Sequence, residues 1–279
     1  MDKKQIFSHI AASASDGELA FPTHARLAMK LREALENQDC PMETAARLVQ
    51  AEPLLSARIV SMANSVVYNR SGNHSTDVRM AVMRLGFGTV RTLAMALVTR
   101  QLSGSGGPPE LQQIAAQLWE HTAHVASLAH LIARRVTHVD PETALFTGIV
   151  HEIGGFYMLS CAARHPGLLE GDWTDWVASG RAEVGRAVMH VLNAPEVVLN
   201  AVESYWEGYL ALPPRTLGDT LLIAEELAPV VSPLSVLGAL KPSGDASSDL
   251  EMLIGKETLT SILEASAEDV RSLKVALTT

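Results

Sequence analysis

The chain has few cysteines and few aromatic residues, and it lacks the long apolar runs of membrane proteins. Only Cys40 and Cys161 occur among its 279 residues, so a disulfide framework is excluded and a reducing cytoplasm is the simplest setting. No apolar run reaches the ~18 residues that are needed to span a bilayer. Residues 1–5 lack the apolar stretch of a signal peptide. We therefore expect a cytoplasmic protein.

The sequence also lacks a convincing strand pattern, a short-period repeat, a glycine-rich phosphate loop and a nucleophile elbow. Aromatic residues make up 5% of the chain, whereas hydrophobic residues as a whole make up 47%. Abundant Ala, Leu, Val and Met favour helices that pack closely through small side chains. The composition therefore predicts an all-α fold with a substantial core.

The acidic and basic residues are unevenly distributed. The net charge of −9 argues against non-specific binding of nucleic acid by the whole molecule. Residues 69–100 nevertheless contain five arginines and one acid, whereas residues 242–279 contain seven acidic and three basic residues. The arginine-rich segment is either a solvated helix face or a binding surface for an anionic ligand or an acidic partner. The candidate surface residues are Arg70, Arg79, Arg84 and Arg91.

Helical periodicity extends along nearly the whole chain and is interrupted most clearly at residues 103–109, which contain three glycines and two prolines. We therefore predict an N-terminal helical bundle, a linker, a second helical domain and an acidic helical tail. Their bounds are 1–103, 104–109, 110–240 and 241–279.

Individual helices carry start and stop signals. Pro53 opens a helix whose apolar face would include Leu55, Ile59, Met62 and Val66. The next helix would be capped by Ser75 or Thr76 and end at Gly86. Later helices are predicted to begin near Leu111, Pro141, Ala182, Pro195, Thr216 and Glu257.

Two histidines lie on apolar helical stripes. His121 shares a stripe with Leu118 and Val125, and His151 shares one with Gly148 and Gly155. Small residues beside His151 would let a second helix approach closely. Glu152 follows His151, so two histidines and a glutamate from two helices could hold a divalent metal. The alternative is that each is a core histidine bonded to a backbone carbonyl or a water molecule.

Several separated motifs occur in an order that resembles the HDOD proteins, the HD-related output domain of bacterial signalling. They are Phe21-Pro22, residues 51–56 with Glu52 and Pro53, residues 63–68 with Asn64, Ser65 and Tyr68, residues 81–86 with Gly86, residues 118–121 and residues 147–154. The likeness covers roughly residues 18–230. It implies an N-terminal helical bundle packed on a helical domain related to the HD phosphohydrolases.

The resemblance also implies a regulatory module, because HDOD proteins generally lack the full metal set of HD enzymes. Here the His-Asp pair of those enzymes is His151-Glu152, and Tyr205-Trp206 stands where they often carry a further histidine pair. Glu225 is the nearest substitute for their late aspartate.

We therefore expect a non-catalytic signal-transduction module that binds a partner protein or a nucleotide second messenger. The alternative is a metal-dependent phosphohydrolase with His121, His151 and Glu152 as ligands. DNA binding through the helices around residues 85–88 is a third option, but the apolar second helix is unsuited to reading DNA. In the regulatory interpretation, Asn64 and Ser65 would fix the loop 68–74 and so present the arginines.

Overall fold

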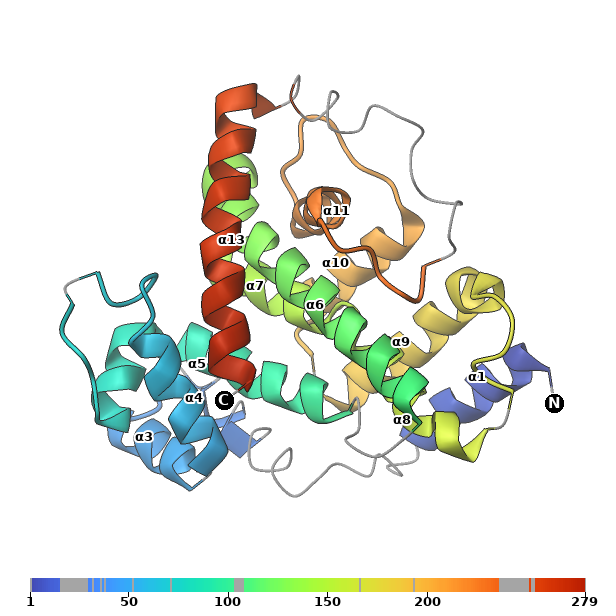
Figure 1. Cartoon of the computed structure of the whole chain (residues 1–279), viewed down its shortest axis with the longest axis horizontal. Helices are drawn as coiled ribbons and strands as arrows, with labels where there is room; N and C mark the ends of the chain where they lie inside the picture. Colours follow the sequence, from blue (N-terminus) through green and yellow to red (C-terminus); the bar gives the residue numbers. More distant parts are fainter. Residues whose placement is uncertain are drawn as a thin grey trace.

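The structure is a computed structural model in which every regular element is helical across the part of the chain that it describes (Figure 1). This confirms the predicted all-α fold. The residues described are 2–15, 30–31, 33–35, 37, 39–51, 53–70, 72–102, 108–165, 167–192, 194–235, 251 and 254–278.

Three helices form a bundle in the N-terminal half: α3 (Met42–Gln50), α4 (Pro53–Ala63) and α5 (Val78–Leu102). Gly86 interrupts α5 with φ 75° and ψ 164°, a conformation that favours glycine. The predicted helix stop at Gly86 is therefore a sharp kink between two helical stretches. The apolar side chains after the kink, Val90, Leu93 and Leu97, are buried and unavailable for contact with DNA.

Two details of this bundle differ from the prediction. Val66 was expected on the buried face of α4, but the helix ends at Ala63 and the Val66 side chain is 72% exposed. Neither Ser75 nor Thr76 caps α5. The Asp77 carboxylate instead accepts hydrogen bonds from the backbone N–H groups of Arg79 (3.2 Å) and Met80 (3.3 Å), because it lies closest to the free donors of the first turn.

The second half is built around α6 (Pro109–Ile132), which lies at the centre of the molecule (Figure 1). A π-helical turn (Ala133–Thr137) follows it. The remaining helices are α7 (Pro141–Val150), α8 (Ile153–Cys161), α9 (Arg181–Val191), α10 (Glu196–Glu207) and α11 (Leu217–Leu227). The predicted starts at Pro141, Ala182, Pro195 and Thr216 agree with these bounds to within one residue.

A very close approach of α6 and α7 positions the two histidines. A Cβ atom on Gly148 of α7 would lie 2.4 Å from the backbone Cα of Ala126 on α6. Only glycine permits this separation, so the sequence prediction of a close helix contact beside His151 is confirmed. The contact brings the middle of α6, with His121, against the end of α7, with His151.

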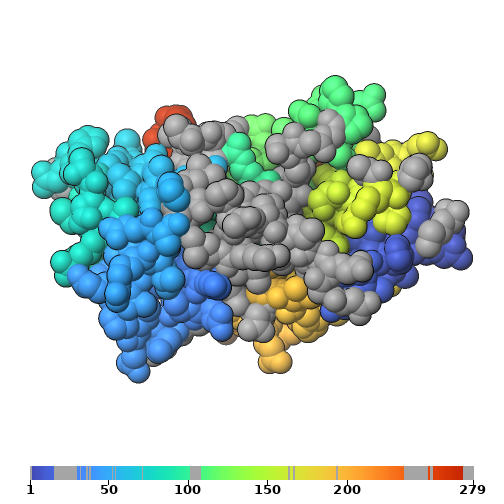
Figure 2. Space-filling model, turned by 90° about the horizontal axis from the view of Figure 1, so that it is seen from below, coloured from blue at the N-terminus to red at the C-terminus, as the bar shows by residue number. Residues whose placement is uncertain are grey.

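The two terminal helices cross the predicted domain boundaries. Residues 3–13 form α1, which packs on α8 and α9 at the end of the molecule opposite to α3 and α4 (Figure 2). The C-terminal helix α13 (Lys256–Thr278) runs along α6 and also contacts α4. Contacts between α5 and α7 further join the N-terminal bundle to the second half.

Two helical stretches, Val78–Arg100 and Pro141–Cys161, have the length and apolar composition of a membrane span. However, 67% and 89% of their apolar windows are buried inside the protein. Core helices of soluble proteins commonly have this character.

Candidate functional site

His121 and His151 face each other where α6 meets the junction of α7 and α8. His121 points inward from α6, whereas His151 ends α7 and Glu152 begins α8. The sequence analysis placed His151 and Gly155 on one continuous helix, and this is wrong. The backbone of Glu152 departs from helical geometry, with φ −104° and ψ 17°, so the chain turns directly after His151. Both histidines are buried, with 1% and 3% of their surface exposed.

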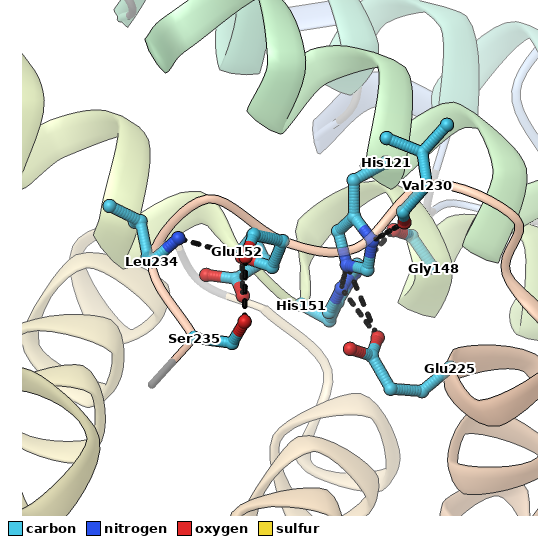
Figure 3. Close-up of polar contacts among 9 residues, drawn as sticks. His121, Gly148, His151, Glu152, Glu225, Val230, Leu234 and Ser235 are labelled. Atoms are coloured by element: carbon cyan, nitrogen blue, oxygen red, sulfur yellow. Dashed lines mark hydrogen bonds and ion pairs between the residues drawn. The ribbon is translucent and has the colours of Figure 1, made fainter. Parts of the chain in front are cut away.

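Backbone carbonyls orient both imidazole rings (Figure 3). Nδ1 of His121 lies 2.8 Å from the carbonyl oxygen of Val230, and Nδ1 of His151 lies 2.7 Å from that of Gly148. A carbonyl oxygen only accepts, so each Nδ1 must carry the hydrogen. In a neutral ring the other nitrogen, Nε2, then presents a lone pair. The two Nε2 atoms face each other at 3.3 Å.

Glu225 of α11 completes this group, and we call His121, His151 and Glu225 the histidine cluster. Its Oε2 lies 3.2 Å from Nε2 of His121 and 3.6 Å from Nε2 of His151. This oxygen is buried, and the polar groups that contact the carboxylate are the two imidazoles and the Tyr205 hydroxyl. Three acceptors therefore converge on one point that requires a shared cation, either a proton or a metal ion.

The pKa values of His121 and Glu225 are shifted in the directions that allow the two residues to share a proton. Burial opposes protonation of His121, but the charge of Glu225 and the contact with it outweigh burial and raise the pKa of His121 to about 9. Burial likewise opposes ionisation of Glu225. The charge of His121 and contacts with both imidazoles nevertheless hold the pKa of Glu225 well below its usual range. With no metal bound, a proton on His121 thus neutralises the carboxylate.

The spacing of the three acceptors also suits a metal ion. Two ligand atoms that each lie about 2.1 Å from an ion at tetrahedral angles are about 3.4 Å apart. The three observed separations, 3.2, 3.3 and 3.6 Å, are close to this value. Glu152 belongs to the same neighbourhood, since it, His121 and His151 offer ligand atoms within 4.8 Å of one another. The donor set therefore fits one divalent ion.

Residues 228–235, which follow α11 and which we call the strap, run past His121 and Glu152 (Figure 3). The strap supplies the Val230 carbonyl to His121, and the Ser232 hydroxyl donates to Oε1 of Glu152 at 3.2 Å. Leu234 lies so close to α8 that a Cβ on Gly155 would be 2.6 Å from its Cδ1. Glu152, predicted as a ligand, is thereby engaged with the strap.

Aromatic side chains occupy the region where a further histidine pair would be expected. The Tyr205 ring stands edge-on to His151, with ring centroids 5.6 Å apart. Arg181 holds this segment, since its guanidinium lies 5.7 Å from the Tyr205 ring centroid and donates to the Trp206 carbonyl at 2.8 Å. Trp206 packs on α9, where a Cβ on Gly185 would meet its ring at 2.8 Å. Bulk here leaves little space for a second metal.

The predicted arginine surface is divided by the structure. Arg84 donates to the carbonyls of Ala63 (2.9 Å) and Asn73 (2.8 Å), so it ties the loop to α4. Asn64 assists, because its amide nitrogen donates to the Ser75 carbonyl and its oxygen accepts from the Ser75 N–H, both at 2.7 Å. We call Asn64, Ser75 and Arg84 the loop lock.

The other arginines lie around this lock. Arg79 is exposed and pairs with Glu43 at 3.2 Å, whereas the Arg91 guanidinium lies 5.9 Å from the centroid of the Phe146 ring. Arg70 is exposed on the loop itself.

The remaining residues of the motifs that carry the HDOD resemblance lie in structural positions. Pro53 begins α4, and the Ser65 hydroxyl lies 4.0 Å from the sulfur of Met62. Tyr68 is half-buried, and burial together with the charge of Glu142 raises the pKa of its phenol to about 12. Glu52 and the Phe21-Pro22 motif lie outside the described residues. Sequence reasoning missed Val230 and Ser232, because a loop that contributes a carbonyl and a hydroxyl carries no recognisable motif.

Known proteins share this architecture. A structure described as a "putative metal-dependent phosphohydrolase" from Shewanella amazonensis SB2B is 22% identical, with a TM-score of 0.67 over 99% of this chain and 100% of that one. An HDOD domain protein from Geobacter sulfurreducens is 18% identical, with a TM-score of 0.70 over 99% of each chain. A "putative signal transduction protein" from Marinobacter aquaeolei VT8 is 16% identical, with a TM-score of 0.63 over 99% of this chain and 67% of that one.

At sequence identities of 16–22%, the similarity to these structures establishes the fold alone. No match was found among curated proteins. The family model of the HDOD domain matches residues 21–173, more than half of the chain. The predicted resemblance is therefore confirmed, and the chain belongs to the HDOD domain family.

Proposed function

We propose that this protein is a non-catalytic signal-transduction module that acts by binding a partner protein. One observation carries the proposal: both imidazoles of the histidine cluster are buried. A catalytic metal site must keep a coordination position open for water or substrate. Here both imidazoles are almost fully buried, and the Val230 carbonyl is bonded directly to the first of them. The side chain of Glu225 is 25% exposed, so a phosphoryl group could approach this carboxylate but would meet two buried imidazoles.

The surface beside the loop lock supports partner binding. Val66, Met80 and Met83 expose 72%, 53% and 60% of their surface on the loop and on the first stretch of α5. Arg70 and Arg79 are exposed on the same segment. Exposed apolar side chains flanked by cations suit a partner that presents apolar and acidic residues. A nucleotide second messenger remains the alternative ligand for these arginines.

The second candidate function is that of an HD-type metal-dependent phosphohydrolase, and the acceptor spacing of the histidine cluster favours it. His121, His151 and Glu225 would hold one divalent ion, with Glu152 as a further ligand if it left Ser232. Such an ion would act as a Lewis acid on a phosphoryl oxygen. The residues of the chain would orient the imidazoles through Val230 and Gly148 and exclude water through the strap.

Metal analysis and hydrolysis assays separate the two functions. Protein purified without chelators should contain well under one metal ion per chain. With added Mn²⁺, Fe²⁺ or Zn²⁺ it should not hydrolyse bis(p-nitrophenyl) phosphate. Stoichiometric metal together with hydrolysis that disappears in His151→Ala would replace the regulatory proposal with the enzymatic one. His190→Ala is the matched control, because His190 is an exposed histidine on α9.

Charge reversal tests the partner surface. The double variant Arg70→Glu/Arg79→Glu should lose the proteins that wild type captures from the native host in a pull-down. Its melting temperature should barely change, because exposed charges usually contribute within about 0.5 kcal/mol. The control is Arg186→Glu/Arg271→Glu, which reverses two exposed arginines on α9 and α13. Equal capture by wild type and the Arg70/Arg79 variant would exclude this surface.

A further inference from the structure

A cavity of about 230 Å³ is lined by residues of α1 and of the end of α8. These two helices lie at the end of the molecule opposite to α4 (Figure 1). We call it the α1–α8 cavity. Its lining residues are His9, Ile10 and Ser13 of α1 and Cys161, Arg164 and His165 at the end of α8 and in the turn after it. Ile10 and Cys161 are buried, whereas His9 and Arg164 are exposed. The cavity therefore has an apolar floor and a mouth that opens to solvent.

Three basic side chains lie at the mouth of the α1–α8 cavity. The His9 and His165 rings meet edge-on, with centroids 5.7 Å apart, and Arg164 adds a permanent positive charge. Among the lining residues that the structure describes, none is a carboxylate. Burial, together with the like charges of His9 and Arg164, lowers the pKa of His165. An anion in the cavity would remove this repulsion.

The pairing of Arg164 differs from that of other arginines on the surface. Arg79, Arg186 and Arg271 each lie within 3.2 Å of a glutamate oxygen. Arg164 instead donates from one terminal nitrogen to the sulfur of Cys161 at 3.1 Å, and a thiol is a weak acceptor. The guanidinium also interacts with the Tyr157 hydroxyl, and these two contacts anchor it at the cavity wall without neutralising its charge.

The size of the α1–α8 cavity limits what it can take. Pockets for drug-sized ligands occupy about 300–1,000 Å³, so 230 Å³ suits a smaller molecule than a dinucleotide. Arginine recognises phosphate oxygens through paired N–H donors, and the Ser13 hydroxyl and the two imidazoles can donate further hydrogen bonds. The cluster thus matches a compact anion with several acceptor oxygens.

We propose that the α1–α8 cavity is a binding site for a phosphate group, either inorganic phosphate or the phosphate of a small ester. Arg164 holds the phosphate oxygens from one wall, and His9, Ser13 and His165 donate to them around the mouth. This site is separate from the histidine cluster and from the surface at Arg70 and Arg79. It would give the module a small-molecule input in addition to its protein partner.

Calorimetric titration of the full chain with inorganic phosphate tests the site, with ionic strength held constant by sodium chloride. Wild type should bind one phosphate per chain. Arg164→Gln should weaken binding about tenfold or more, because it removes the charge-assisted hydrogen bonds. The matched control is Arg271→Gln, which removes an exposed arginine on α13 and should bind as wild type does.

Ser13→Leu provides an independent variant that fills the α1–α8 cavity from the opposite wall and keeps Arg164. It should also abolish binding, while circular dichroism and thermal unfolding show that both variants remain folded. Parallel titration with glycerol 3-phosphate identifies the source, since tighter binding of the ester than of phosphate would assign an organic ligand. No saturable phosphate binding by wild type, or binding that survives both Arg164→Gln and Ser13→Leu, would overturn the proposal. The titrations are made in the presence of a chelator, so this outcome is independent of the metal assay.

Discussion

The loop lock of the N-terminal half and the histidine cluster of the second half are both built from polar side chains around a chain turn. In the loop lock, every hydrogen bond joins a donor to an acceptor: Arg84 and the Asn64 amide donate to carbonyls, and the Ser75 N–H donates to Asn64. In the histidine cluster, three acceptors face one another.

This difference separates a structural network from one that depends on an added ion. When every donor in a network has an acceptor, the hydrogen bonds stabilise the fold without any added ion. Converging acceptors repel one another until a cation arrives. The histidine cluster must therefore take up a proton or a metal ion, and its stability must depend on the solution. The loop lock has no such dependence.

The largest expected effect comes from Gly148→Val, which separates the helices that carry the two histidines. Its new Cβ would lie 2.4 Å from the Ala126 backbone, where no side chain can move aside. We expect a loss of about 3 kcal/mol or more in the free energy of unfolding, measured by urea denaturation. Ala116→Val, at an exposed position of α6, is the control and should cost no more than about 0.7 kcal/mol. Equal losses in both variants would contradict the close helix contact.

Arg84→Met tests the loop lock and should have a somewhat smaller effect. Methionine keeps the apolar stem but leaves the carbonyls of Ala63 and Asn73 without their charged donor. The expected loss is about 2–3 kcal/mol, because hydrogen bonds to charged groups are stronger than neutral ones. Arg79→Met removes the exposed pair with Glu43 and should change stability by less than about 1 kcal/mol. If Arg79→Met lowered the free energy of unfolding as much as Arg84→Met, the assignment of Arg84 alone to the loop lock would be wrong.

Stability against pH distinguishes the two networks directly. The pKa of His121 is about 9 in the folded chain, above the value of about 6.5 in an unfolded one. Its raised pKa contributes stability that is fully present below about pH 6.5 and is lost as the pH rises through about 9. In the presence of a chelator, wild type should therefore lose roughly 1–3 kcal/mol between these pH values.

Two variants test whether the histidine cluster produces this dependence of stability on pH. Glu225→Gln removes the charge that raises the pKa of His121 and should flatten the curve. Arg84→Met should keep the slope at lower overall stability, because it leaves His121 and Glu225 in place. A wild-type curve that is flat in the chelator would show that the histidine cluster does not hold a proton in this way.

Local patterns predicted the fold better than the site. The helix starts near Pro141 and Thr216 and the close contact at Gly148 follow from side-chain chemistry within one helical turn. Val66 was misplaced because its helical spacing continues beyond Ala63, where the chain leaves the helix to form the loop lock. The packing of α1 on α8 and α9 could not be predicted, since it depends on contacts across more than 140 residues.

The histidine cluster shows the same limit. His121 and His151 were found by their apolar stripes, and Glu225 was proposed from the resemblance to the HD enzymes, as the nearest substitute for their late aspartate. Glu152 was predicted to join them because it is adjacent in sequence. The structure places its ligand atom within 4.8 Å of those of both histidines, and the turn after His151 also lets it reach Ser232, 80 positions away. Side-chain spacing thus identified which helices meet, but it could not describe the strap that covers them.

Ser232→Ala should have the smallest effect on stability and tests whether the strap closes the histidine cluster. The hydroxyl donates to Glu152 and accepts from the Leu234 N–H at 3.3 Å, so its loss should cost about 1 kcal/mol. Ser204→Ala, whose hydroxyl bonds within α10, is the matched control.

Hydrogen exchange should quicken in residues 228–235 of the Ser232 variant while exchange in α6 stays unchanged, because local opening precedes global unfolding. Added Zn²⁺ should then bind this variant faster than it binds wild type or the Ser204 variant. If exchange and metal uptake match wild type, the strap is held by other contacts, and closure by Ser232 is excluded. Faster uptake without any hydrolysis would show that access to the cluster alone does not produce catalysis, as expected for a module whose aromatic pair, Tyr205 and Trp206, fills the region of a second metal.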